Sequence, residues 1–312
     1  YRRKARLGVR YVAKKEKVLV GFRERKSSFI TVMSRCEVLH PSLGDNLEII
    51  EECLGKLSIR EHIPQIEAAI SESHTILILR HLQPLTEADE ATLKECGEKL
   101  SITWYTQSGG LDTIKPLIEA VTLTYSIPDH KIEMEFLPND FTQVNFALNQ
   151  KMINLAIGLL ELNDQDSVLD LFCGLGNFTL PISKYVEKIV GIEGDKGLVE
   201  RAKANADANG ITNASFYKAD LSEDVSGSEW FRGQKYNKAL IDPARTGAIE
   251  IVELLPKLNI ERLVYVSCNP STLARDTARL IELGFTLVSA GVMDMFPQTA
   301  HVESIALFTR KK

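Results

Sequence analysis

Hydrophobic and polar residues follow one pattern in the first half of this 312-residue chain and another in the second half. Near the start they alternate singly, which predicts strands over 7–11, 18–22 and 29–33. Up to residue 138, the spacing then predicts helices over 41–57 and 87–100, strands over 63–70 and 75–81, and a hairpin over 121–136. Thr86 and Asp89 have the spacing of a capping box at the start of the second of these helices.

Beyond Pro138, short apolar runs alternate with helical segments. Helices are expected over 145–162, 177–185, 196–209, 249–257 and 271–283. Strands are expected over 167–172, 188–193, 214–220, 238–243, 262–268, 285–290 and 304–309. Such alternation is typical of a parallel sheet covered by helices. We therefore predict an α/β protein with a smaller α+β domain over 1–138 and a Rossmann-like domain over 139–312.

Composition supports a globular protein and argues against a membrane protein or a disulfide framework. The chain is 44% hydrophobic and 25% charged, and it has no apolar run long enough to cross a bilayer. Its five cysteines are odd in number and irregularly spaced, which favours a reducing cytoplasm. Because the chain begins at Tyr1, inside an expected strand, we expect it to be a fragment or a trimmed form.

Positive charge is concentrated at the start of the chain. Residues 1–35 contain twelve lysines and arginines but only two acids, a formal charge of +10 in a chain whose net charge is −5. A basic face on an acidic body suits contact with nucleic-acid phosphates. The same charges would also protect the edge of a sheet from pairing with another sheet. Charge alone does not separate the two interpretations.

A glycine-rich turn and a series of acids follow consecutive strands of the second half. Gly174 and Gly176 come directly after an apolar run, and Glu193, Asp220 and Asp242 end the next three strands. Thr179 stands where a dinucleotide fingerprint has a third Gly or Ala, which weakens an NAD interpretation. Acids often cap turns after strands, but four polar strand ends in succession favour a pocket for a nucleoside cofactor.

Cys268 lies where the strand Val264-Tyr265-Val266 meets the Asn269-Pro270 turn. Ligands of open α/β sheets bind at this edge, so the cysteine is a candidate nucleophile. A lone cysteine on an apolar strand is more often a buried core residue. The rest of the C-terminal half reverses that preference.

Six motifs resemble those of the RNA 5-methyluridine methyltransferases, in particular the branch that methylates uracil in 23S ribosomal RNA. They occur in family order: FLPNDFTQVN (136–145), DLFCGLGNFTLP (170–181), GIEG (191–194), DPARTG (242–247), YVSCNPSTLARD (265–276) and MDMFPQTAHVES (293–304). The N-terminal half is similar more loosely, through YRRKARL, GFR and the pair Arg35-Cys36.

The resemblance implies S-adenosylmethionine as methyl donor, Cys268 as nucleophile and Glu303 as the base that removes the C5 proton. It places six residues around the cofactor: Gln143, Phe172, Asn177, Glu193, Asp220 and Asp242. A thiolate that adds to C6 makes C5 of uracil nucleophilic, and the base must leave its stack to be reached. Phe141 is expected to stack on it by family analogy. We also expect nearby donors or positive groups to lower the pKa of Cys268.

The chain departs from the family pattern in three places. The branch carries a four-cysteine iron–sulfur cluster, and here only Cys36 matches a ligand, the fourth in chain order. The other three ligands would precede Tyr1, so the resemblance places the 4Fe-4S cluster in the full-length protein, as it does the small N-terminal RNA-binding barrel (TRAM). Cys53 and Cys96 are expected in the core. Gln298 replaces a histidine common in relatives, whereas His301 remains and is expected to orient the base or its loop.

The leading hypothesis is therefore a cytoplasmic, monomeric 23S rRNA uracil-5 methyltransferase with no membrane association. One alternative keeps the chemistry and changes the substrate to uracil in transfer RNA, or to cytosine, although no group that would protonate cytosine N3 stands out. The other is a non-catalytic RNA-binding or ribosome-assembly protein that retains an unused pocket. The sequence does not indicate which uracil is modified.

Overall fold

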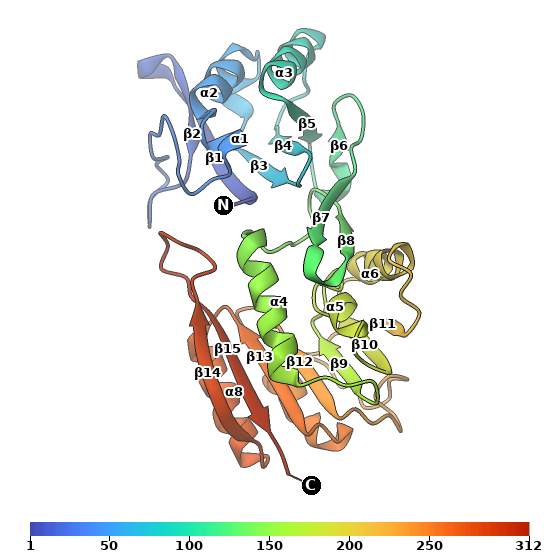
Figure 1. Ribbon diagram of the computed structural model, residues 1–312. Coiled ribbons are helices and arrows are strands. Elements are labelled where there is room, and N and C mark those ends of the chain that lie inside the picture. Colours follow the sequence, from blue (N-terminus) through green and yellow to red (C-terminus); the bar gives the residue numbers. More distant parts are fainter. Residues whose placement is uncertain (312) are drawn as a thin grey trace. The chain divides into compact units, whose positions relative to one another are not determined.

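The computed structural model describes residues 1–311, which form two compact units (Figure 1). The N-terminal unit contains Tyr1–Tyr125 and Phe136–Phe146. The C-terminal unit contains Ser126–Glu135 and everything from Ala147 onward. The chain thus passes between the units more than once, at the hairpin of β7 (Leu123–Ile127) and β8 (Ile132–Phe136) and again before the helix that follows.

A six-stranded sheet forms the N-terminal unit, in the order β2-β1-β3-β4-β5-β6. The strands are β1 (Lys4–Val12), β2 (Lys17–Gly21), β3 (Gln65–Ile70), β4 (Thr75–Arg80), β5 (Ile102–Gln107) and β6 (Lys115–Pro116). All pairs are antiparallel except β4 with β5. Helices α2 (Leu47–Lys56) and α3 (Glu87–Leu100) contribute Ile50, Leu54 and Leu93 to the core. The predicted capping box of Thr86 and Asp89 is confirmed.

Three expectations for this unit need correction. Residues 29–33 do not form a strand, because the segment folds back over Gly8 and Gly21 and makes only an isolated bridge between Arg23 and Ile30. The helix expected over 41–57 is interrupted, with α1 (Pro41–Gly44) ending where Gly44 packs against the backbone of Cys36. Strand β5 was not expected, since a single left-handed residue, Ser101, separates it from α3.

The C-terminal unit is a seven-stranded sheet with the order β11-β10-β9-β12-β13-β15-β14. Its strands are β9 (Ser167–Leu171), β10 (Lys188–Glu193), β11 (Ala214–Lys218), β12 (Lys238–Ile241), β13 (Arg262–Ser267), β14 (Thr286–Met293) and β15 (Glu303–Thr309). The first five of these are parallel, and β15 runs antiparallel to both of its neighbours. The central parallel strands β9, β12 and β13 are apolar runs buried on both faces, as in other sheets covered by helices, whereas the edge strand β11 is largely exposed.

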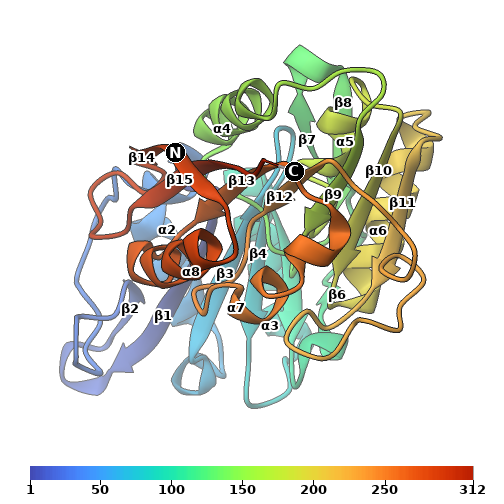
Figure 2. The same cartoon turned by 90° about the horizontal axis from the view of Figure 1, so that it is seen from below.

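Helices cover both faces of this sheet, so the predicted α/β fold class is confirmed. They are α4 (Phe146–Leu160), α5 (Thr179–Ser183), α6 (Lys196–Ala208), α7 (Ile249–Val252) and α8 (Pro270–Glu282). Figure 2 shows α4 on one side of the central strands and α8 on the other. The helix expected over 249–257 is shorter than predicted and continues as a 3₁₀ turn over Leu255–Leu258. Among residues 1–311, no helix combines the length and apolarity needed to cross a bilayer.

Candidate active site

The predicted site residues of the C-terminal unit lie at or after the carboxyl ends of its parallel strands, except for Glu303, which begins the antiparallel strand β15. The strand order reverses between β9 and β12, because successive strands extend from β9 in opposite directions. At such a switch point the loops diverge and leave a crevice, where open α/β sheets bind their ligands. The glycine turn after β9 and the loop 242–248 after β12 flank this point.

The glycine turn provides an open stretch of backbone. Phe172, Gly174 and Gly176 all have positive φ angles, of 66°, 55° and 92°. A Cβ at Gly174 would have no described atom within 4 Å, whereas one at Gly176 would lie 2.3 Å from Leu180. The turn therefore requires glycine at both positions, and its first glycine faces open space that a ligand can approach closely. Phe172 packs partly against the core of the unit.

Glu193, at the end of β10, connects this turn to the next strand. Its Oε2 accepts a hydrogen bond from the Gly174 amide at 3.0 Å, and its Oε1 accepts one from the Asp195 amide at 3.1 Å. Each carboxylate oxygen has a second lone pair, so the half-buried side chain can still accept hydroxyl groups. This arrangement suits recognition of a ribose.

Asp170 is a site residue that sequence reasoning missed. Its Oδ2 accepts a hydrogen bond from the Thr179 hydroxyl at 2.5 Å, and its buried Oδ1 has no partner among the described residues. Burial, opposed by the Thr179 bond and reinforced by the charges of Asp242 and Glu193, raises its pKa to about 7. An unpartnered buried oxygen beneath an open glycine turn fits a ligand that carries a donor group. The signal in the sequence was an acid inside the apolar run before the first glycine.

Asn177 is held by a second residue that was not expected. Its amide group and that of Asn149 in α4 exchange two hydrogen bonds, of 2.8 and 3.0 Å. Asn149 is almost fully buried, so the pair fixes the orientation of the Asn177 side chain. The two residues are 28 positions apart, and no local pattern connects them.

Asp220 is exposed on the surface just beyond β11. Its carboxylate accepts hydrogen bonds from the amide and the hydroxyl of Ser222, which lower its pKa. Gln143 and Phe141 belong to the N-terminal unit, where Phe141 is 69% exposed. The roles expected for these three residues stay predictions.

Cys268 follows the last residue of β13 directly, and Glu303 is the first residue of the neighbouring strand β15. In the antiparallel pair β13–β15, Ser267 lies opposite Ser304, so the next positions outward are Cys268 and Glu303. The strand pairing itself ends at Ser267, and Glu303 is close enough to Cys268 to raise the pKa of the thiol. Cys268 is partly exposed, so it is not a buried core cysteine. Glu303 is only 2% exposed, so it is not a solvated surface acid.

Acidic groups dominate the electrostatics around Cys268. Burial and the charge of Asp242 raise the pKa of Glu303 to about 8, and burial raises that of Asp242 to about 7. The pKa of Cys268 is also raised, first by burial and then by Glu303 and Asp242, with Arg245 opposing. The expected lowering of the Cys268 pKa is therefore wrong, because burial, together with two carboxyl groups, outweighs one guanidinium.

The loops around Cys268 contact one another through Arg245 and Asn269. The Asn269 amide donates a hydrogen bond to the Arg245 carbonyl at 2.9 Å and also caps α8 through the Ser271 amide. An Arg245 guanidinium nitrogen lies 3.4 Å from Nε2 of His301, whose ring meets Phe296 edge-on. His301 therefore contacts the loop of Arg245, and its effect on the reaction stays a prediction.

The remaining cysteines lie outside this site. Cys36 is partly buried in the N-terminal unit, while Cys53 and Cys96 are 5% and 7% exposed core residues, as expected. No group of three or more His, Cys, Asp or Glu side chains within 1–311 could hold a metal ion. The described residues alone thus do not fit a four-cysteine cluster.

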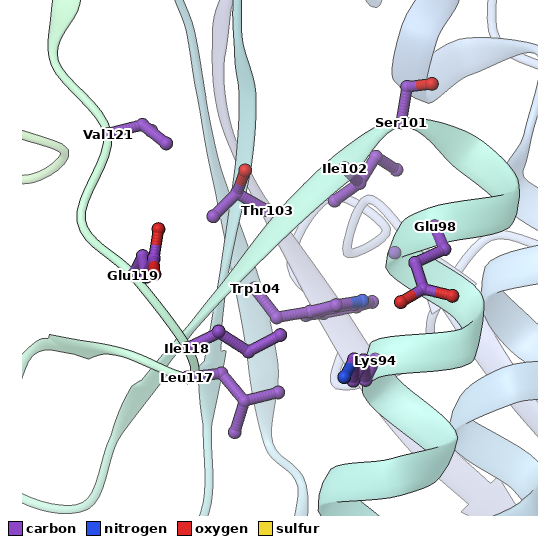
Figure 3. Close-up of a pocket in the computed structure, with 11 residues that line it drawn as sticks. Lys94, Glu98, Ser101, Ile102, Thr103, Trp104, Leu117, Ile118, Glu119 and Val121 are labelled. Carbon is purple, nitrogen blue, oxygen red and sulfur yellow. The ribbon is translucent and has the colours of Figure 1, made fainter.

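A separate pocket of about 310 Å³ in the N-terminal unit contains none of the predicted site residues. Figure 3 shows the Trp104 ring between α3 and the segment 117–121 that line it.

The chain is similar to proteins of known family and fold. A family described as tRNA (Uracil-5-)-methyltransferase matches residues 48–311. The chain belongs to this family. A protein of Vesicomyosocius okutanii named 23S rRNA (uracil(1939)-C(5))-methyltransferase RlmD is 68% identical over 311 residues, which cover the whole chain and 71% of that protein. The protein of the same name from Stenotrophomonas maltophilia (strain R551-3) is 49% identical and is covered over 70% of its length.

Among solved structures, the fold is similar to a Pyrococcus abyssi tRNA (uracil-54, C5)-methyltransferase in complex with S-adenosyl-L-homocysteine. The TM-score is 0.77 at 21% identity, with 99% of this chain and 76% of the other covered. The resemblance to the uracil-5 methyltransferase family inferred from the motifs is thus confirmed. So is the methyltransferase fold of the C-terminal unit.

Proposed function

We propose that this protein methylates C5 of a uracil in 23S ribosomal RNA through a covalent bond between Cys268 and C6 of the base. The proximity of Cys268 and Glu303, at the adjoining ends of β13 and β15, carries this proposal. The names of the relatives support the substrate, since the two compared above are both named as 23S rRNA uracil methyltransferases.

The two side chains divide the chemistry between them. Cys268 Sγ adds to C6 as a thiolate. The electron pair of the C5=C6 bond then shifts toward C5 and the C4 carbonyl, which makes C5 nucleophilic. When bound, S-adenosylmethionine supplies a methyl group on a positively charged sulfur. Glu303 then accepts the C5 proton, and the returning electrons restore the double bond and expel the Cys268 thiolate.

The raised pKa values fit the role of proton acceptor. A carboxyl with a pKa of about 8, as in Glu303, holds a proton more strongly than an ordinary glutamate and removes one more readily once ionised. Asp242, with a pKa of about 7, is close enough to influence both Glu303 and Cys268. A cation bound beside these three groups would favour their ionised forms.

The cofactor is assigned to the glycine turn and the strand ends around it. Glu193 would accept the ribose hydroxyls, Asp220 the adenine amine, and the unpartnered Asp170 oxygen a donor such as an ammonium group. Phe172, Asn177 and Asp242 border the same crevice, and Gln143 is proposed from the family motif.

RNA contact is assigned to the basic N-terminal segment. Arg10, Lys14, Lys15, Arg25 and Lys26 are exposed, and the structure of residues 1–311 gives none of them an acidic partner. They suit contacts with phosphates. We further expect a cytoplasmic monomer, and an iron–sulfur cluster that Cys36 helps to hold in a longer form of the protein.

A mechanism-based trap tests the proposal. RNA with 5-fluorouridine has no C5 proton to remove, so the methylated adduct should stay attached to the protein. The purified protein, S-adenosylmethionine and 5-fluorouridine-substituted 23S fragments should give a denaturant-resistant complex, mapped to Cys268 by mass spectrometry. Cys268→Ala should abolish the complex, whereas Cys53→Ala, in the core of the other unit, should retain it.

Substrate alternatives are outcomes of the same assay. Methyl incorporation into separated transfer RNA rather than 23S fragments would support the substrate in the description of the matching family. RNA binding that is unchanged in Cys268→Ser, with neither adduct nor turnover from the unmodified protein, would indicate a non-catalytic RNA-binding protein and overturn the proposal.

A further inference from the structure

Asp276 is a fully buried acid in α8 that takes no part in the chemistry proposed above. Its Oδ2 accepts hydrogen bonds from the Tyr265 hydroxyl at 2.6 Å and from the Ala248 amide at 2.8 Å. Its Oδ1 accepts one from Nε of Arg275 at 2.8 Å, and Nη2 of Arg275 lies at 2.7 Å. Several donors are needed to offset the cost of burying a carboxylate, and a buried network satisfied in this way holds its partners in a fixed arrangement.

Those partners belong to the segments that carry the reactive groups. Tyr265 is in β13, three residues before Cys268. Ala248 ends the loop that begins with Asp242 and contains Arg245. Asp276 itself lies in α8, whose N-cap is Asn269, the residue after Cys268. The Asp276 carboxylate thus connects the loop after β12 to the strand that precedes Cys268 and to the helix that follows it.

Further contacts fix the same loop to the same helix. Nη2 of Arg275 donates a hydrogen bond to the Thr246 carbonyl at 2.9 Å. Gly247 has a φ of +79°, and a Cβ there would lie 2.6 Å from both Asp276 Oδ2 and Arg275 Nη2. The loop therefore rests directly on the carboxylate, and only glycine fits at the point of contact.

We propose that Asp276 is a positioning residue that holds the loop 242–248 against α8 and so fixes Asp242 and Arg245 relative to Cys268. The inference rests on the proposed function in one respect, the role of Cys268 as nucleophile. Because Coulomb interactions change with distance, movement of this loop would alter the balance of charge at the Cys268 sulfur. A shift of about 1 Å in a reacting group can cost about 100-fold in rate.

Asp276→Asn tests this, because it preserves volume but places an amide nitrogen where donors now converge. We expect turnover to fall about 100-fold with less than about a threefold change in KM for S-adenosylmethionine. The pH profile for alkylation of Cys268 by iodoacetamide, followed by peptide mass spectrometry, should shift relative to the unmodified protein. Tyr265→Phe, which removes one hydrogen bond and keeps the ring, should shift it in the same direction by less.

Arg279→Gln is the matched control, since Arg279 lies on the same helix and pairs with the exposed Glu253. It should leave both turnover and the alkylation profile unchanged. Circular dichroism establishes that each variant is folded. A folded Asp276→Asn with normal turnover and an unshifted profile would overturn the proposal. If that variant does not fold, normal turnover and an unshifted profile in folded Tyr265→Phe would do so.

The alkylation profile needs neither RNA nor turnover. If the unmodified protein proves inactive on every RNA, the proposed function fails, while a shifted profile in the Asp276 and Tyr265 variants would still support the positioning role.

Discussion

The edge of the C-terminal sheet carries two groups of acids that differ in their surroundings. Asp220 and Glu193, after β11 and β10, keep contact with water and accept hydrogen bonds from nearby amides. Glu303, which is buried, begins β15, and Asp242, which is partly exposed, follows β12; the two interact with each other and have pKa values raised to about 8 and 7. The outer pair, Asp220 and Glu193, is suited to holding a ligand through hydrogen bonds, and the inner pair, Glu303 and Asp242, to exchanging protons near neutrality.

Removing the acid of Glu303 should have the largest effect. Glu303→Gln keeps the shape but cannot accept the C5 proton, so turnover should fall about 10²- to 10⁴-fold. The covalent RNA adduct should accumulate with ordinary uridine, because the protein can form it but not release it. Gel analysis under denaturing conditions measures both. Glu250→Gln, which changes an exposed acid in α7, should behave normally. Wild-type turnover in Glu303→Gln would contradict the distinction between acids that hold a ligand and acids that exchange protons.

The inner group should also make stability fall as pH rises. The folded pKa of Glu303 is raised above its unfolded value near 4.5, so its protonated form stabilises the fold at low pH. This contribution should be lost as pH rises from about 4.5 through about 8, on the order of 5 kcal/mol. Urea unfolding at several pH values should show the decline, and Glu303→Gln should flatten it. Asp220, whose folded pKa is lowered, has the opposite sign. A decline unchanged by the mutation would contradict this account.

Glu193→Gln should act on binding instead of on the chemical step. Replacing a carboxylate that accepts hydroxyl hydrogen bonds costs about 1.5–3 kcal/mol, or roughly 10- to 150-fold in the KM for S-adenosylmethionine. The rate at saturating cofactor should change little. Glu200→Gln, on α6 and paired only with Lys196, is the control. A lower rate at saturating cofactor with a normal KM would instead indicate that Glu193 acts in the chemical step, as proposed for Glu303.

Asp220→Asn should have the smallest effect, about two- to tenfold in the same KM, because one hydrogen bond to the adenine amine is at stake. Asp224 offers a matched control, since it is also exposed and accepts a hydrogen bond from the amide two residues later. Asp224→Asn should leave KM unchanged. Equal effects of the two substitutions would show that Asp220 has no particular role.

Much of the C-terminal fold was predictable because its signals are local. The parallel strands are apolar runs, and their bounds differ from expectation by only a few residues, as at 214–220 against Ala214–Lys218. The interrupted helix near Gly44 and the missing strand over 29–33 were not, since both depend on packing against distant backbone. Strand β5 was missed because a single residue, Ser101, reverses the chain before it.

The candidate site was predictable where a motif carries it and not where partners are distant. Cys268, Glu303, Glu193 and Asp242 came from short motifs and strand ends. Sequence reasoning missed three residues, Asp170, Asn149 and Asp276. Neither an unpartnered oxygen nor a hydrogen bond between residues 28 positions apart produces a pattern in the sequence. The predicted direction of the Cys268 pKa shift was wrong because the shift depends on burial and on the charges that the fold brings close to the sulfur, which the sequence does not show.

The reversed direction of β15 makes the acid of this site sensitive to strand alignment. Alternate side chains of a strand point to opposite faces, so a slip of one step would turn Glu303 away from the sulfur and present Ser304 in its place. A hydroxyl group cannot remove a proton from carbon at neutral pH. Because β15 pairs with β13 on one edge and with β14 on the other, its alignment is fixed. This pairing therefore keeps Glu303 in position for the reaction as well as stabilising the fold.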